Sequence, residues 1–265
     1  MRDTSQCTKN NIISQRQTIW AEQTLFILIA FSNMTMKTIG LIGGMSWKSS
    51  LEYYRIINKQ VKDKLGGFHS AESLMFSVDF DEIEKLQYQG NWRESAKIMI
   101  DAAKRLERGG ADFVVLCTNT MHKTADEIQD NIKIPLLHII DATAEKIKDK
   151  GLKKVGLLGT KFTMEEDFYK GRLIKKYGLD VLTPNEKDME IVNDVIYHEL
   201  CFGKINQSSK SQFIKIINKL VDNGAEAVIL GCTEIPLLIQ QKDVKVPLFN
   251  TTRIHAEAAV EYALK

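Results

Sequence analysis

Two stretches, GADFVVLCT at 110–118 and GAEAVILGCT at 224–233, repeat one pattern in the two halves of the chain. In each, a run of apolar residues ends at a cysteine, Cys117 or Cys232, and a threonine follows. Continuous apolar runs of this length are typical of strands buried on both faces of a parallel sheet. Because open α/β sheets bind ligands at the carboxyl ends of their strands, both cysteines are predicted to lie where a ligand would bind.

The repeat extends to both sides of the cysteine strands. Upstream, KTIGLIGG at 37–44 matches KKVGLLGT at 153–160, and the spacing to the cysteine agrees to within one residue. Downstream, IPL at 134–136 matches VPL at 246–248. Strands that alternate with helices predict an α/β fold in which helices flank a mostly parallel sheet. Two copies predict two pseudo-symmetric domains, with the active site in the cleft between them.

The repeat also suggests where the domains divide. We place the first α/β domain at 36–135 plus 246–265, and the second at 136–245. Residues 1–35 do not fit the pattern, since they are polar and Gln-rich except for a short apolar stretch at 25–31 that cannot span a bilayer. Met34 and Met36 stand directly before the first strand. We expect residues 1–35 to be a disordered leader or the product of a start site assigned too far upstream.

Composition narrows the class of protein. The chain has 265 residues, 44% hydrophobic and 26% charged, which is enough material for one large or two medium α/β domains. A net charge of +2, without a basic cluster, gives no reason to expect a nucleic-acid partner. Four cysteines without close pairing do not make a disulfide framework or a zinc site. We therefore expect a cytoplasmic protein with reduced thiols and no membrane partner.

The two glycine loops that open the halves are candidate ligand loops. Gly43-Gly44-Met45-Ser46 follows the first predicted strand, and Gly159-Thr160 follows its counterpart. Neither is a dinucleotide fingerprint, because the spacing G-x-G-x-x-G is absent. Ser46 and Thr160 are therefore predicted to contact a small ligand at the start of a helix.

Two other residues that could carry chemistry are interpreted as structural. His138 lies in an apolar run predicted as a strand over 136–140, where a core histidine is commoner than a catalytic one. Cys201, at the end of a predicted helix, is interpreted as a packing residue. Neither is included among the predicted site residues.

Two thiols that face each other across a cleft suit stereoinversion. One cysteine, as a thiolate, removes a proton from a carbon, and the other, as a thiol, returns a proton to the opposite face. A free thiol titrates near ~8.5, so backbone N–H groups at a helix start would have to lower its pKa. Thr118, Asn119 and Thr233 are positioned for that task. The same donors could bind a substrate carboxylate.

The motifs CTNTMHK, GCTEIPLL and GGMSW resemble those of the aspartate/glutamate racemase family, and the resemblance covers residues 36–265. It implies a cofactor-independent racemase that interconverts L- and D-amino acids, with Cys117 and Cys232 as the acid/base pair. It also implies a homodimer with no metal, whose partner is a small-molecule amino acid. The substrate contacts that it implies are Met45, Gln87, Thr118, Asn119, Thr120 and Thr233.

The resemblance leaves the substrate open. Lys204, in CFGKI, matches a lysine of aspartate-preferring members and would meet a side-chain carboxylate, whereas the whole chain is more similar to the broad-specificity branch. Glutamate racemases have histidine after the second Cys-Thr, where this chain has Glu234. That difference argues against a cell-wall glutamate racemase.

Other functions remain open at this stage. A hydantoin racemase also keeps two cysteines, and a decarboxylase of similar fold keeps one. A two-lobed amino-acid binding protein would have the same lobes and cleft, with the cysteines only packed. A metal hydrolase with Cys117, His122 and Cys232 as ligands is a weaker alternative, because no HxxxH or CxxC spacing supports it. No pyridoxal-binding motif is recognisable.

Overall fold

The computed structural model describes residues 36–265, so the predicted leader at 1–35 lies outside the described residues. The strands are β1 (Ile39–Gly43), β2 (Ser73–Ser77), β3 (Phe113–Leu116), β4 (Leu136–Leu137), β5 (Lys154–Gly159), β6 (Asp180–Leu182), β7 (Ala227–Gly231) and β8 (Leu248–Asn250). The helices are α2 (Trp47–Leu65), α3 (Phe80–Tyr88), α4 (Trp92–Arg108), α5 (Ala125–Gln129), α6 (Ile139–Asp149), α7 (Lys161–Glu165), α8 (Asp167–Tyr177), α9 (Glu186–His198), α10 (Gln207–Asp222), α11 (Ile235–Leu238) and α12 (Thr251–Ala263). The 3₁₀ turns are η1 (Thr120–Thr124), η2 (Leu200–Phe202) and η3 (Gln241–Asp243).

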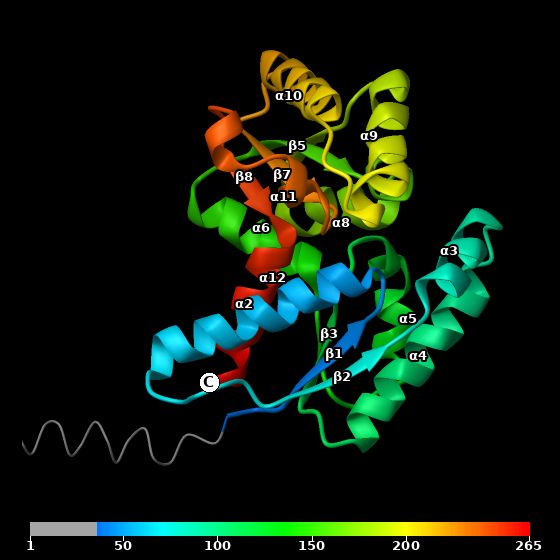
Figure 1. Cartoon of the computed structure of the whole chain (residues 1–265), viewed down its shortest axis with the longest axis vertical. Coiled ribbons are helices and arrows are strands. Elements are labelled where there is room, and N and C mark those ends of the chain that lie inside the picture. The colour runs from blue at the N-terminus through cyan, green and yellow to red at the C-terminus, as the bar shows by residue number, and fades with distance from the viewer. Residues whose placement is uncertain (1–35) are drawn as a thin grey trace, which may run out of the picture. The chain divides into compact units, whose positions relative to one another are not determined.

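The strands form two four-stranded parallel sheets, with the orders β2-β1-β3-β4 and β6-β5-β7-β8. The two orders are the same when β1 to β4 are matched in turn with β5 to β8, as the repeat predicts. Every residue of β1, β3 and β7 is buried, in keeping with strands covered on both faces. The predicted fold class, two pseudo-symmetric parallel sheets flanked by helices, is confirmed (Figure 1).

The helices form because their apolar residues lie on one stripe. In α4, for example, Met99, Ala103 and Leu106 are buried against the first sheet, while charged residues point outward. Asn91 caps the helix by accepting a hydrogen bond from the Glu94 N–H, and the helix ends at Gly109. α4 therefore returns the chain to the end of the sheet at which β3 begins, and β3 then carries it to Cys117 at the opposite end.

The helices α6 and α12 cross between the halves. α6 follows β4 of the first sheet, yet Ile140 and Ile147 pack into the core of the second sheet. α12 follows β8 of the second sheet, yet it packs on α2 (Figure 1). The ring of Tyr262 in α12 also lies edge-on to Phe113 of the first sheet. The first half thus contributes α6 to the core of the second half, and the second half contributes α12 to the first.

This crossing corrects the predicted domain boundaries. The division at 135/136 and 245/246 assigns both helices to the sheets that they cover, but it assigns β4 and β8 to the wrong sheets. The register pairs Val115 with Leu137 in the first sheet and Ile229 with Phe249 in the second. The chain therefore changes halves after each of these strands, and Lys37–Ala263 forms one compact unit.

The predicted strand over 136–140 is also too long. β4 ends at Leu137, and His138 is the N-cap of α6, where its ring nitrogen accepts a hydrogen bond from the Ile140 N–H. Because His138 caps α6, the residues after it are helical and cannot continue β4.

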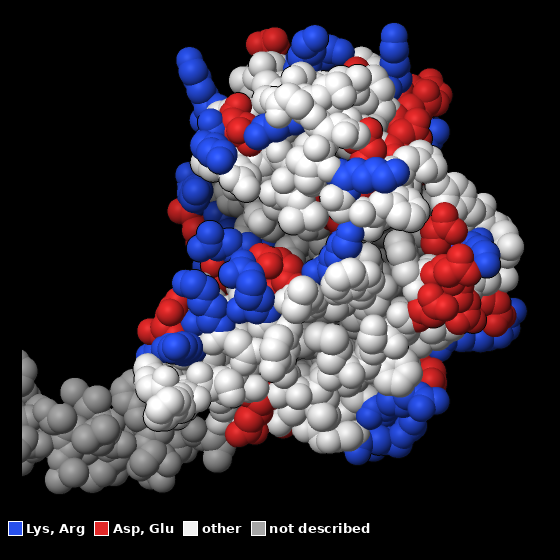
Figure 2. Space-filling model, in the orientation of Figure 1, with Lys and Arg blue, Asp and Glu red and all other residues white. Residues whose placement is uncertain are grey.

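The surface shown in Figure 2 carries both signs of charge along its edges, and its middle is largely uncharged. Many of the charges pair three or four residues apart on one helix, as Lys97 does with Glu94 and Arg105 with Asp101. Such exposed pairs contribute little to stability. Across residues 36–265, none of the helices combines the length and apolar character that a bilayer crossing requires.

Candidate active site

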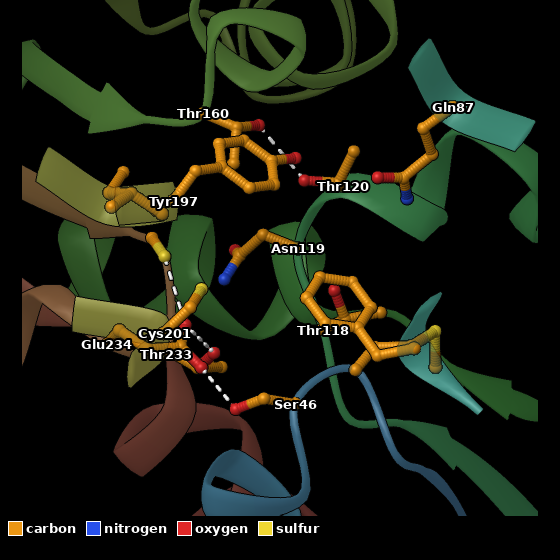
Figure 3. A pocket seen from close by; sticks show the side chains of 15 residues that line it. Ser46, Gln87, Thr118, Asn119, Thr120, Thr160, Tyr197, Cys201, Thr233 and Glu234 are labelled. Atoms are coloured by element: carbon orange, nitrogen blue, oxygen red, sulfur yellow. Dashed lines mark hydrogen bonds between the residues drawn. The ribbon is translucent and has the colours of Figure 1, made fainter. Parts of the chain in front are cut away.

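A small cavity, about 30 Å³ in volume, lies at the carboxyl ends of the strands and takes residues from both halves. Figure 3 shows Ser46, Thr233 and Glu234 together at one end, Thr120 and Thr160 at the other, and Asn119 between them. The residues that line the cavity and that the sequence predicted are Met45, Ser46, Gln87, Thr118, Asn119, Thr120, Thr160, Cys232 and Thr233.

Two predicted site residues do not line the cavity. Cys117 is fully buried behind it, with its Sγ 3.8 Å from the Val115 carbonyl oxygen, although the next three residues do reach the cavity. Lys204 lies in the exposed loop after η2, with its Nζ 5.8 Å from the centre of the Phe202 ring.

Several residues that the sequence did not predict also line the cavity. Cys201, interpreted as a packing residue, is one of them, and Tyr197 extends its ring toward the cavity from α9 (Figure 3). The repeat could have identified Glu234 as a site residue, because Glu234 occupies the place of Asn119 when the two Cys-Thr pairs are aligned. The remaining members of this set are Phe80, Ile196 and Gly231.

The loop that carries Met45 and Ser46 depends on Gly44. Gly44 has a φ of 103°, and a Cβ built there would lie 2.1 Å from the Val78 carbonyl oxygen. Its N–H donates to Ser50 Oγ at 2.8 Å, which ties the loop to the first turn of α2. Only glycine fits this combination of backbone angle and close approach.

We expect Gly44→Ala to lower the free energy of unfolding by about 3 kcal/mol, since it combines an unfavourable φ with a backbone clash. Gly67→Ala is the matched control, because Gly67 also has a positive φ, 54°, but its Cβ would meet nothing within 4 Å. That variant should lose only about 1 kcal/mol. Urea unfolding of both variants measures the difference, and equal losses would contradict the role of Val78.

Glu234 is the centre of a buried hydrogen-bond network. Its Oε1 accepts from Ser46 Oγ at 2.8 Å and from Ser49 Oγ at 2.6 Å, both at the start of α2. Its Oε2 accepts from Thr233 Oγ1 at 2.6 Å and from Cys232 Sγ at 3.1 Å. The first turn of α2 has no acidic residue of its own, so Glu234 supplies the negative charge that a helix N-terminus favours.

Asn119 makes the equivalent connection in the opposite direction. Its Nδ2 donates to Thr251 Oγ1 at 3.1 Å, and its Oδ1 accepts from Tyr169 Oη at 3.2 Å. Next to it, the hydroxyls of Thr120 and Thr160 lie 3.0 Å apart. Asn119 and Glu234, which follow the two Cys-Thr pairs, therefore each bind residues of the other half. These contacts hold the two cysteine loops at a fixed separation.

The environment of the two thiols differs from the prediction. Burial raises the pKa of the Cys117 thiol, and burial followed by the charge of Glu234 raises the pKa of Cys232 well above its usual range. A backbone hydrogen bond from Glu234 does lower the pKa of Cys232, as expected of a backbone N–H group, but burial and the charge of Glu234 raise it more. The physical reason is that both sulfurs are buried without a cation beside them, which disfavours the thiolate.

Three buried histidines lie behind the cysteine loops. His122 is between His138 and His255, at ring-centroid distances of 4.6 and 5.7 Å. The Ile139 N–H donates to His122 Nε2, so His122 Nδ1 carries the hydrogen that binds the Thr118 carbonyl at 2.7 Å. His255 Nε2 lies 2.8 Å from the Leu137 carbonyl oxygen and donates to it.

These contacts keep the histidines uncharged. Burial lowers the pKa of His122 far below its usual value, that of His138 to about 3 and that of His255 to about 4. Both nitrogens of His122 are occupied by the backbone, which does not fit the weaker alternative of His122 as a metal ligand. Across residues 36–265, no three His, Cys, Asp or Glu side chains are grouped so that they could hold a metal ion.

The site combines a thiol, a carboxylate and several hydroxyl and amide groups around one small cavity. Cys232 can exchange a proton with a ligand in this cavity, because it lines it. Thr118 and Asn119 offer hydrogen bonds to a ligand carboxylate, whereas the hydroxyl of Thr233 donates to Glu234. This arrangement suits proton transfer at a carbon next to a carboxylate.

Known proteins are similar to this chain in sequence and fold. A family model described as Asp/Glu/Hydantoin racemase matches residues 42–259. The chain is 28% identical over 170 residues to the broad-specificity amino-acid racemase RacX of Bacillus subtilis, covering 63% of this chain and 71% of that protein.

Two solved structures are similar over the same region. A Yersinia pestis protein assigned to the Asp/Glu racemases is 53% identical, with a TM-score of 0.82, and the match covers 87% of this chain and 100% of that one. An aspartate racemase homologue from Pyrococcus horikoshii is 39% identical, with a TM-score of 0.76 and the same coverage. The family match includes strands β2 to β8, and with them both cysteine strands.

Proposed function

Because the chain belongs to the Asp/Glu/hydantoin racemase family, we propose that it interconverts L- and D-amino acids by proton transfer between Cys117 and Cys232. The observation that carries the proposal is the position of the two thiols at the ends of equivalent central strands, β3 and β7. A ligand between the loops that follow β3 and β7 has one Cys-Thr pair on each side. No cofactor is needed for this chemistry, because the substrate carboxylate and its hydrogen-bond donors stabilise the charge that develops when the α-proton leaves.

The proposed reaction has two proton transfers. A thiolate on one side removes the α-proton, and the electron pair of the C–H bond moves onto the α-carbon and the carboxylate. Thr118 and Asn119 donate hydrogen bonds to that carboxylate from their side chains, and Thr233 does so through its backbone N–H. The thiol on the other side then gives its proton to the opposite face of the planar carbon. For this step Cys117 must turn its sulfur from the Val115 carbonyl into the cavity.

The substrate range that we propose is broad, with aspartate and glutamate included. The bacterial relative RacX carries a broad-specificity description, whereas the Pyrococcus protein is described as an aspartate racemase homologue. Glu234 is the one charged side chain in the cavity lining of the described chain, and no lysine or arginine lines it. A neutral side chain therefore fits the cavity as well as an acidic one, unless Lys204 moves in.

The proposal is tested by incubating the protein with single L- and D-amino acids in deuterated buffer. We expect Cα deuterium exchange, read by proton NMR, together with optical inversion. The protein should be dialysed against a chelator and treated with a carbonyl-trapping reagent beforehand, since the proposed chemistry needs neither metal nor pyridoxal phosphate. Exchange without inversion for every amino acid would contradict a racemase, and activity restored only by an added cofactor would contradict the two-thiol chemistry.

A further inference from the structure

A second cavity, of about 470 Å³, adjoins the small cavity beside Cys232 and shares the lining residues Ser46, Phe80, Tyr197 and Cys201 with it. We call the small cavity the inner cavity and the second one the outer cavity. The inner cavity, at about 30 Å³, holds little more than one water-sized group, whereas the outer cavity has the volume of a small-molecule site. A ligand whose α-carbon lies beside Cys232 therefore finds room for a long side chain in the outer cavity.

The hydroxyl of Tyr197 lies where the two cavities meet. Tyr197 comes from α9 and lines both cavities, and only 9% of the residue is exposed. Its phenol points into the inner cavity, and within residues 36–265 its Oη has no hydrogen-bond partner (Figure 3). A phenol oxygen can both donate and accept, and buried polar groups are rarely left unpaired. This hydroxyl is therefore available to a ligand that extends from one cavity to the other.

The outer cavity carries negative charge. Figure 2 shows acidic side chains gathered over α3, and Asp81 and Glu84 of this helix line the outer cavity. Within residues 36–265, no lysine or arginine lines it. Lys85 pairs with Asp81 at 2.5 Å and offsets its charge. Glu84 is half-buried, and no basic side chain of the described chain lies within 4 Å of its carboxylate. Glu84 therefore offers an uncompensated negative charge to a ligand.

The charge of Glu84 acts at the entrance to the inner cavity. Burial raises the pKa values of Tyr88, Tyr197 and Cys201, and in each case the charge of Glu84 adds to the rise. All three residues line the outer cavity. Lys48 of α2 acts on Cys201 with the opposite sign, but it lines neither cavity. A side chain that leaves the inner cavity past Tyr197 therefore approaches a carboxylate.

Aromatic rings form the walls of the outer cavity. They belong to Trp47, Phe80, Tyr88, Tyr197 and Phe202. The ring centroids of Tyr88 and Tyr197 lie 5.8 Å apart, and Trp47 and Phe202 are 64% and 70% exposed. Aromatic faces attract cations, and they also cover the CH₂ groups of a long side chain. An aliphatic chain that ends in a cation therefore matches both the walls and the charge of this cavity.

We propose that the outer cavity binds the side chain of the substrate, and that Glu84 and the hydroxyl of Tyr197 bind a cation at its end. Amino acids with long cationic side chains, such as lysine, are then the preferred substrates within the broad range. This inference rests on the proposed function, since it places the α-carbon of the substrate beside Cys232. Glutamate would bring a second carboxylate toward Glu84, and like charges repel.

The test compares lysine with norleucine, whose side chain is similar but lacks the ammonium group. For the wild type, kcat/KM from Cα deuterium exchange should be about tenfold higher for lysine, the scale of one hydrogen bond to a charged group. Glu84→Gln should abolish this ratio, mainly through a higher KM, because the contact exists in the ground state as well as in the transition state. Tyr197→Phe should lower the ratio by a smaller factor, about threefold, because it removes a neutral acceptor.

The matched control is Glu82→Gln, which removes an exposed carboxylate of α3 that does not line the outer cavity and should leave the ratio unchanged. Glu84→Lys should reverse the preference, so that norleucine exceeds lysine and kcat/KM for glutamate rises. A ratio that survives Glu84→Gln, or that falls equally in Glu82→Gln, would overturn the role of Glu84.

Calorimetry of lysine and norleucine binding measures the same contact without turnover. Lysine should bind the wild type about tenfold more tightly than norleucine, and Glu84→Gln should remove the difference. Equal affinities in the wild type would overturn the cation site even if the protein is a racemase. If the protein neither exchanges nor inverts any amino acid but binds lysine through Glu84, the proposed function fails and the outer cavity remains a cation site.

Discussion

Alanine in place of either Cys117 or Cys232 is expected to lower kcat for racemisation by roughly 10³-fold, within the range for a lost general acid or base. Both thiols act in every turnover, one as the base and the other as the acid, so each substitution removes an obligatory group. Because the two enantiomers of an amino acid have equal free energies, kcat/KM must fall by the same factor in both directions. Polarimetry, started from each pure enantiomer, measures both rates.

The two variants should differ in isotope exchange. Each retains one thiol, which can remove and return a proton on one face only, so each should exchange the α-hydrogen of a single enantiomer without inverting it. The enantiomer should be opposite for the two variants. Circular dichroism of each variant is the control for folding. Wild-type racemisation by either variant would contradict the two-base mechanism, and exchange of the same enantiomer by both would contradict opposite faces.

The free energy of unfolding is expected to fall by about 4 kcal/mol from about pH 7.5 to about pH 5.5 because of the three buried histidines. In the unfolded chain a histidine titrates near 6.5. In the folded chain the pKa values of His122, His138 and His255 are all depressed, to about 3 for His138 and about 4 for His255. Below pH ~6.5 the unfolded state therefore binds protons that the folded state does not, and stability falls with pH.

Each histidine contributes about 1.4 kcal/mol over this whole window, because its unfolded pKa lies in the middle of it. The carboxyl of Asp141, which lies near His138, does not contribute there. Burial raises its pKa, but hydrogen bonds from Arg172 and Lys176 lower it more, so its effect on stability is confined to pH values below about 4. The window is therefore specific to the histidines.

Urea unfolding as a function of pH measures the effect. His255→Gln keeps a donor for the Leu137 carbonyl and an acceptor for Tyr53 Oη but does not titrate, so the fall should shrink by about 1.4 kcal/mol. His69→Gln, at an exposed loop position, is the matched control and should change nothing. If the free energy of unfolding were the same at about pH 7.5 and about pH 5.5, the three histidines would bind protons in the folded state, which would contradict the prediction.

The sequence predicts those parts of the site that follow directly from a strand. The cysteine strands, the glycine loops and the threonines after each cysteine are local patterns, and Ser46, Thr160 and Thr233 all line the cavity. Glu234 was identified only as a difference from other racemases. Its network depends on Ser46 and Ser49, which are 188 and 185 positions away, and no local pattern contains such a contact.

The sequence could not predict which helix faces line the cavity. Tyr197 and Phe80 belong to helices whose apolar stripes also cover the core, and a stripe does not show which of its members borders a cavity. Similarly, the short strand β4 and the helix α6 form one continuous apolar run, which conceals the change of half at His138. The misassigned domain boundary follows from this, since periodicity indicates the type of element but not the sheet to which it belongs.

The crossing of α6 and α12 makes the two halves of the protein thermodynamically inseparable. Cutting the chain after β4 would leave the first sheet without α12, and would expose apolar side chains of α2 and β3 that α12 covers. The second sheet would keep its own strands but would depend on α6 from the start of the fragment. Neither half is a complete folding unit, although each has a complete sheet. The duplicated pattern therefore describes an interlocked pair that unfolds in one cooperative transition, in which loss of either half removes part of the core of the other.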